Sequence, residues 1–165
     1  MGTRWSEVPR QRAGDLSREL AGTRRQIHRR PELGFKEEET SRLICAKLKE
    51  LGIKYGEGIG KTGVVGMIEG MGDGKTVGLR ADMDALPLQE ESDIPYSSEN
   101  RGVMHACGHD AHVACLMGAA KLLSSLRDQF TGKIELVFQP AEEIDLGAKA
   151  MLGEGILEDP RPNAF

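Results

Sequence analysis

The sequence lacks the features that mark several classes of protein. No hydrophobic run among its 165 residues is as long as a segment that crosses a lipid bilayer. The arginines near the N-terminus are not followed by an apolar stretch, so no secretory signal is visible. The net charge of -4 gives no reason to expect a nucleic-acid partner. We therefore expect a protein that binds neither a membrane nor nucleic acid.

Cysteine is scarce, and its count indicates a reducing compartment. The chain contains Cys45, Cys107 and Cys115, an odd number. In a chain without a visible signal, this favours free thiols over a disulfide framework, so we expect a cytoplasmic protein. Repeats and low-complexity tracts are absent. A length of 165 residues, with 39% hydrophobic and 29% charged, suits one globular domain with one core.

Helical and extended patterns alternate along the chain, which predicts a layered α/β domain. Residues 1–14 are polar and basic, and we expect them to form a flexible lead-in. The glycines between residues 56 and 60 are interpreted as loop, because no phosphate-binding Gly-Lys-Ser/Thr follows them. Gly52 stands where a helix C-cap is expected. The predicted helices are 15–28, 37–51, 111–126 and 147–152, and the predicted strands are 63–68, 76–80 and 133–138.

Residues 104–112 (MHACGHDAH) concentrate groups that bind metals. Cys107 and His109 are two positions apart, so a turn at Gly108, rather than a regular helix, would bring them together. Imidazole and thiolate at short spacing favour a zinc-like ion. A cysteine nucleophile with a histidine base is the alternative that this motif leaves open. His28, outside the motif, is expected to pack or hydrogen-bond at a helix end.

Two further polar clusters follow predicted strands. Asp82 and Asp84 follow one strand, and Glu142 and Glu143 follow another. In open α/β sheets, ligands bind beyond the carboxyl ends of the strands, so these carboxylates and the 104–112 turn could reach one rim. In an adjacent pair, one carboxylate can bind a metal while the other transfers protons. The sequence therefore predicts one mixed site of acidic, imidazole and thiolate groups.

Four motifs follow one another along the chain: RQIHRRPELGF at 25–35, GLRADMDALP at 78–87, MHACGHDAH at 104–112 and QPAEE at 139–143. In this order, they resemble the dinuclear-metal amidohydrolases of the aminoacylase and carboxypeptidase superfamily. The branch is the one that contains hippurate hydrolases, N-acyl-amino-acid amidohydrolases and plant auxin-conjugate hydrolases. The resemblance runs from about Leu20 to the end of the chain.

The resemblance implies a role for five residues. In the proteins it resembles, the central turn and the second glutamate bind two divalent ions, which assigns Cys107, His109 and Glu143 as metal ligands here. The first glutamate, Glu142, would be the general base, and Asp84 takes the place of an aspartate that supports the centre. Mn, Zn, Co and Ni are not distinguishable. The implied reaction is hydrolysis of the amide bond of an N-acyl amino acid by a metal-activated water.

The resemblance also implies parts that this chain does not contain. In the family, a layered α/β/α metallopeptidase-like catalytic domain is interrupted by a dimerisation domain, and two downstream histidines complete the metal site. Residues 15–165 would be the N-terminal portion of that domain, incomplete at the C-terminus, and the full-length form is compatible with a homodimer. We expect residues 1–165 to hold at most one loosely bound ion and to have little amidase activity. An inactive fragment that acts as a binding or interaction module is the alternative.

Overall fold

Residues 7–165, which the computed structural model describes, fold around a four-stranded mixed sheet in the order β1-β2-β4-β3. The strands are β1 (Lys54–Ile59), β2 (Gly63–Glu69), β3 (Thr76–Asp82) and β4 (Lys133–Gln139). β2 pairs antiparallel with β1 and with β4, whereas β3 pairs parallel with β4. The carboxyl ends of β3 and β4 therefore lie at the same edge of the sheet, where ligands bind in open α/β folds.

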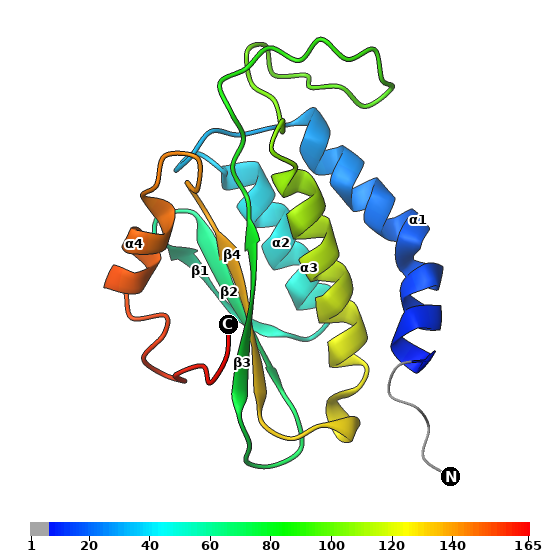
Figure 1. The fold of residues 1–165 in the computed structure, drawn as a ribbon, viewed down its shortest axis with the longest axis vertical. Coiled ribbons are helices and arrows are strands. Elements are labelled where there is room, and N and C mark those ends of the chain that lie inside the picture. Colours follow the sequence, from blue (N-terminus) through cyan, green and yellow to red (C-terminus); the bar gives the residue numbers. More distant parts are fainter. Residues whose placement is uncertain (1–6) are drawn as a thin grey trace.

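Helices cover both faces of this sheet (Figure 1). The helices α1 (Glu7–Arg29), α2 (Glu38–Glu50) and α3 (His109–Ser124) lie on one face, and α4 (Gly147–Gly153) lies on the other. A short 3-10 turn at Arg127–Gln129, η1, leads from α3 towards β4. Within the described residues, none of the helices has both the length and the apolarity of a membrane span. The layers are those of the predicted α/β/α arrangement.

The main core lies between the sheet and the helices α1 to α3. Successive side chains of a strand point to opposite faces, so Leu136 and Phe138 of β4 both enter this core, where they are fully buried. They belong to the same cluster as Leu48 of α2 and Val113 of α3. Burial of each such side chain contributes about 1.5–3 kcal/mol to stability. Glu135, which alternates with them, is buried towards the opposite face.

The first helix is longer than the sequence predicts. α1 begins at Glu7, whereas the sequence predicts a flexible lead-in up to Gly14 and a helix start at Asp15. That boundary is wrong, because a polar, basic segment can also form the first turns of a helix. Pro9 does not prevent this, since proline is tolerated in the first helical turn, where the N–H group has no partner. Residues 1–6 of the predicted lead-in lie outside the described residues.

The glycine-rich stretch interpreted as loop contains β1. Most of this strand is exposed, so it lacks the apolar alternation that identifies a strand from sequence. Pairing with β2 holds it in place, with a register shift beside Gly58, whose φ is 76°. The remaining predicted strands and helices are confirmed, and Gly52 follows α2 with a φ of 62°, as a helix-ending glycine does.

The last residues of the chain run alongside β3. The Asn163 N–H group donates to the Thr76 carbonyl at 2.7 Å, and the Gly78 N–H group donates to the Ala164 carbonyl at 2.8 Å. The Phe165 ring lies over Gly78, where a Cβ atom would collide with it. β3 is therefore paired on both of its edges near its start.

Candidate metal centre

The three polar clusters predicted from the sequence meet at the carboxyl edge of the sheet. Asp82 ends β3, Gln139 ends β4, and His109 begins α3. Gly108, with a φ of 92°, provides the turn immediately before α3. Its left-handed backbone conformation, which glycine adopts without strain, confirms the predicted turn between Cys107 and His109.

Cys107, His109 and Glu143 form a compact group of potential ligands. One ligand atom from each of these residues lies within 4.8 Å of the others. The Glu143 Oε1 atom is buried and has no hydrogen-bond partner in the described part of the chain. Sulfur, nitrogen and oxygen donors suit a zinc-like divalent ion, and an unpartnered carboxylate oxygen is available to a cation. The structure therefore brings together the three residues that the sequence proposes as metal ligands.

His109 is held in one orientation by Asp84. The His109 ring is buried, and its Nδ1 atom lies 2.9 Å from the Asp84 carbonyl oxygen and 3.3 Å from the Asp84 Oδ1 atom. Because Nδ1 donates to these acceptors, Nε2 is the nitrogen that can bind an ion once it has lost its proton. The predicted supporting place of Asp84 is consistent with this contact, and Asp84 itself does not join the group of potential ligands.

Asp84 also fixes the segment that carries the glutamate pair. Its carboxylate is fully buried, and its Oδ2 atom accepts the backbone N–H group of Glu143 at 3.0 Å. Burial alone would raise the pKa of Asp84, but the hydrogen bonds from His109 and from the backbone N–H groups of Glu143 and Glu142 lower it. One buried carboxylate therefore links the histidine of α3 to the turn after β4.

Glu142 lies at the solvent side of the same site. Its Oε2 atom is 3.7 Å from the His109 Nε2 atom, and 39% of its side chain is exposed. Glu143 is more enclosed, with 16% of its side chain exposed. This difference suits a division in which Glu143 holds an ion and Glu142 remains free to move a proton.

The site favours protons or cations strongly. Burial opposes a charge on His109, but the carboxylate and carbonyl of Asp84, with the charge of Asp82, raise the ring pKa to about 9. The contact with the Glu143 carboxylate raises the pKa of the Cys107 thiol. At neutral pH a divalent ion would have to displace these protons, so binding of an ion and release of protons are linked.

His112 is a residue that the sequence analysis does not assign. Asp82, His109 and His112 form a second group whose potential ligand atoms lie within 4.8 Å of one another. The signal was present in the sequence, because residues three apart in a helix share a face. Asp82 also forms an ion pair with Arg80, and its Oδ2 atom lies 3.4 Å from His112 Nδ1. Both groups use His109, so they are not independent sites.

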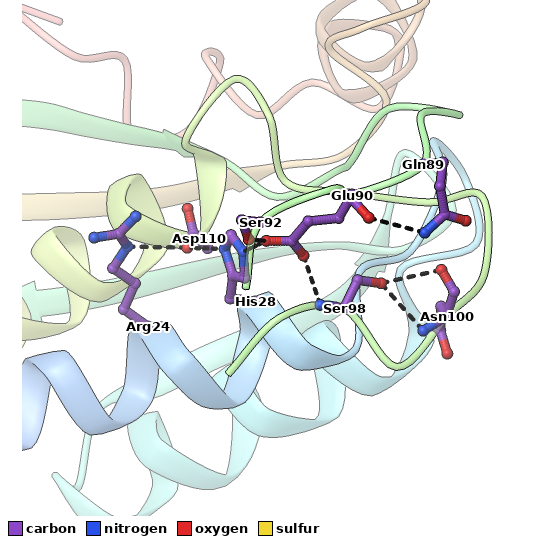
Figure 2. A network of polar contacts seen from close by, with 8 residues as sticks. All are labelled: Arg24, His28, Gln89, Glu90, Ser92, Ser98, Asn100 and Asp110. Atoms are coloured by element: carbon purple, nitrogen blue, oxygen red, sulfur yellow. Dashed lines mark hydrogen bonds and ion pairs between the residues drawn. The ribbon is translucent and has the colours of Figure 1, made fainter. Parts of the chain in front are cut away.

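A second polar network joins the start of α3 to α1 and to the connection that precedes α3 (Figure 2). His28 of α1 lies between two carboxylates: its Nδ1 atom is 2.8 Å from Asp110 Oδ2, and its Nε2 atom is 3.2 Å from Glu90 Oε1. Arg24 Nε also donates to Asp110 Oδ2 at 3.0 Å. Glu90 Oε2 in turn accepts the backbone N–H group of Ser98 at 2.6 Å. The predicted hydrogen-bonding role of His28 at a helix end is confirmed.

Comparisons with known proteins agree with this geometry. Residues 78–165 match the family model described as Peptidase family M20/M25/M40. The chain is 54% identical over 144 residues to the hippurate hydrolase of Campylobacter jejuni. This match covers 87% of this chain and 37% of that protein. It is 54% identical over 137 residues to thermostable carboxypeptidase 2 of Saccharolobus solfataricus, covering 81% and 35% of the two chains.

A solved structure matches the fold closely. The YXEP protein of Bacillus subtilis, described as a dinuclear metal binding peptidase from the M20 family, superposes with a TM-score of 0.84 at 42% identity. The match covers 88% of this chain and 41% of that one. The chain thus spans little more than a third of the length of the curated relatives. The predicted metallopeptidase-like α/β fold and the predicted resemblance are confirmed, and the chain belongs to peptidase family M20/M25/M40.

Proposed function

We propose that this chain supplies the ligands and the general base of a metal-dependent hydrolase that cleaves the amide bond of N-acyl amino acids. The observation that carries the proposal is the convergence of Cys107, His109 and Glu143 beside Glu142. The hippurate hydrolase named above, whose substrate is an N-acyl amino acid, supports the substrate class. The dinuclear metal of the similar peptidase supports a divalent-ion cofactor.

The roles follow from the chemistry of each side chain. Cys107, His109 and Glu143 would hold a divalent ion, with Mn, Zn, Co and Ni as candidates. Such an ion supplies Lewis acidity and lowers the pKa of a water molecule. Glu142, which is partly exposed at the mouth of the site, takes the proton from the attacking water and passes it to the leaving amine. Asp84 is a positioning residue, because it holds His109 and the Glu143 backbone together.

The alternative of a cysteine nucleophile fits the geometry less well. A nucleophilic cysteine needs a lowered pKa and a nearby base that can accept its proton. Here the contact with Glu143 raises the pKa of Cys107. His109, the candidate base, is held as a cation by Asp84 and its neighbours, with a pKa of about 9. In the metal-free site, these shifts therefore argue against a cysteine nucleophile that is activated by His109.

The test is hydrolysis of hippurate and other N-acyl amino acids with added Mn²⁺, Co²⁺ or Zn²⁺. We would assay residues 1–165 and a chimera in which this chain replaces the matching segment of the Campylobacter enzyme, with Glu142→Gln as the control. We expect the chimera to hydrolyse these substrates and EDTA to abolish this activity. The Glu142→Gln control should show no turnover. Activity that resists EDTA but not cysteine alkylation would support the thiol mechanism. No turnover by the chimera with any metal would contradict the proposal.

A second candidate function is that of an interaction module without catalysis. An apolar hollow of about 250 Å³ lies between β4, α4 and the C-terminal residues, and its lining includes Met151, Leu152 and Phe165. Half of the Leu152 surface and 61% of the Phe165 surface are exposed. Size-exclusion chromatography with light scattering tests this candidate. Self-association of residues 1–165 that Leu152→Ser abolishes would favour it, and a monomer that binds no apolar dye would exclude it.

A further inference from the structure

The turn that carries Glu142 has a strained backbone. Ala141, directly before Glu142, has a φ of 49°, a left-handed conformation that costs a non-glycine residue about 1–2 kcal/mol. Its carbonyl oxygen accepts the backbone N–H groups of Leu146 and Gly147, at 3.4 and 3.1 Å. A Cβ atom at Gly147 would collide with the Pro140 carbonyl, so the turn is closely packed. A conformation of this kind persists only where surrounding groups hold it.

Glu37 is the group that reaches this turn. Its carboxylate is fully buried, and its Oε1 atom accepts the Ala141 N–H group at 2.8 Å, although the two residues are 104 positions apart. Its Oε2 atom accepts the hydroxyl of Thr62 at 2.6 Å. Glu37 occupies the N-cap position of α2, yet its side chain makes no capping hydrogen bond. The carboxylate therefore serves the distant turn rather than its own helix.

The turn is held at a second point by Asp84. Glu37 accepts the N–H group before Glu142, at Ala141, and Asp84 accepts the N–H group after it, at Glu143. The two acceptors come from different segments, the start of α2 and the end of β3. With the backbone fixed on both sides, Glu142 and Glu143 have little freedom to leave the vicinity of His109.

We propose that Glu37 is a positioning residue of the metal centre. By holding Ala141 in its left-handed conformation, it places Glu143 against Cys107 and His109 and directs Glu142 to the mouth of the site. The inference rests on the proposed function, because it assigns Glu37 to that same site. Glu37 does not belong to either group of potential ligands among the described residues, and it acts through the backbone of the turn.

The experiment compares Glu37→Ala with Glu37→Gln in residues 1–165. Two quantities are measured: amide hydrogen exchange at Ala141, and Zn²⁺ affinity by competition with a chromophoric chelator. We expect Glu37→Ala to accelerate the exchange and to weaken zinc binding by about tenfold or more, as loss of outer contacts does at metal sites. Glu37→Gln keeps an oxygen for the Ala141 N–H group and should lose much less.

Two further variants separate positioning from general stability. Glu135→Gln alters another buried carboxylate, one without a hydrogen-bond partner at Oε2 in the described residues, and should leave zinc affinity unchanged. Ala141→Gly removes the strain, since glycine adopts positive φ freely, and should restore part of the affinity lost in Glu37→Ala. If Glu37→Ala does not fold, Thr62→Val, which removes only the hydroxyl that orients Glu37, replaces it in both measurements.

The outcomes distinguish this inference from the proposed function. Wild-type zinc binding that Glu37→Ala leaves unchanged would overturn the role of Glu37 alone. An equal loss of affinity in Glu37→Ala and Glu135→Gln would overturn it too, because the effect would then come from stability. A wild-type chain that binds no zinc would contradict the proposed metal centre. Amide exchange at Ala141 would then test the role of Glu37 by itself. Faster exchange in Glu37→Ala than in the wild type would uphold the positioning of the turn, and equal exchange would overturn it.

Discussion

The protonation of the buried histidines depends on the polar groups that each of them contacts. His109 is buried beside Asp84 and near Asp82, and its pKa is raised to about 9. His105, equally buried, shows the opposite behaviour: burial lowers its pKa to about 4, despite the nearby charge of Asp110. At neutral pH, His109 therefore carries a positive charge and His105 is neutral, because, of these two rings, only His109 has direct carboxylate and carbonyl contacts.

Neutral His105 makes the metal-free protein sensitive to acid. Its ring nitrogens are buried and have no hydrogen-bond partner among the described residues. Because the pKa of His105 is lower in the folded state than in the unfolded state, the stability of the fold with a neutral His105 is complete above the unfolded pKa of about 6.5. As the pH falls from there towards about 4, the unfolded chain gains a proton that the folded chain does not, and the free energy of unfolding decreases. Between pH 7 and 5, the unfolding free energy of the wild type should therefore fall by about 2 kcal/mol more than that of His105→Leu. Urea denaturation at the two pH values measures this difference.

The exposed His112 provides the matched control for that measurement. His112→Asn should keep the wild-type dependence on pH in metal-free buffer, because 53% of the His112 side chain is already exposed. Parallel curves for wild type and His105→Leu would show that His105 does not carry the acid sensitivity.

Binding of a divalent ion should release protons from the proposed ligands. The pKa of His109 is raised to about 9 and that of the Cys107 thiol is raised from its ordinary value, so both are protonated at neutral pH. We therefore expect about two protons to leave per zinc ion at pH 7, and affinity to rise with pH. Calorimetry in buffers of different ionisation enthalpy measures this number. Cys107→Ser should release about one proton, and release that is the same in this variant would argue against thiolate ligation.

At the scale of elements, the start of α3 is held from two sides. Asp84 contacts His109 from the β3 side, and His28 contacts Asp110 from the α1 side. The His28 network also includes Glu90, so the long connection between β3 and α3 is tied to α1. Adjacent residues of one helical turn are thus fixed by different elements, which leaves the ligand-bearing turn little freedom.

Removal of His28 should loosen this connection. His28→Leu removes one hydrogen-bond partner from each of the buried carboxylates of Asp110 and Glu90, and a hydrogen bond to a charged group contributes about 1.5–3 kcal/mol to stability. We expect a lower urea midpoint, together with faster amide exchange in residues 89–102. His112→Leu, at an exposed position of α3, is the control and should change neither quantity. Unchanged exchange in 89–102 would show that His28 does not tie this connection.

Elements with a buried apolar face were predictable from the sequence, and the others were not. α2 and β4 follow their periods because each buries one face, and Gly52 marks the end of α2 by its positive φ. β1 gives no such pattern, because it is exposed and is held by backbone pairing with β2. The start of α1 was misplaced, since polarity does not distinguish a surface helix from a flexible lead-in.

The same limit applies to the site. Cys107 and His109 stand close together in the sequence, so their convergence through Gly108 was predictable from local conformation alone. The contact of Glu37 with Ala141 joins residues 104 positions apart and leaves no local pattern. Sequence spacing therefore indicated Cys107 and His109, and the family resemblance indicated Glu143 and Asp84, whereas the positioning role proposed for Glu37 could be identified only from the fold.

At the scale of the whole molecule, the two groups of potential ligands share His109. With Nδ1 engaged by Asp84, His109 offers one nitrogen, so the described residues provide one complete group at a time. The chain spans 37% of the length of the Campylobacter relative. We therefore predict that residues 1–165 bind one divalent ion weakly, and that their amidase activity is far below that of the chimera.

Isothermal titration of residues 1–165 with Zn²⁺ tests the proposed metal centre most directly. The account predicts one ion per chain, with binding strongly weakened by Cys107→Ser and by His109→Ala. Cys115→Ser removes another exposed free thiol, six positions after His109 in α3, and should bind zinc as the wild type does. Two tight sites per chain, or binding that neither Cys107→Ser nor His109→Ala weakens, would contradict the account.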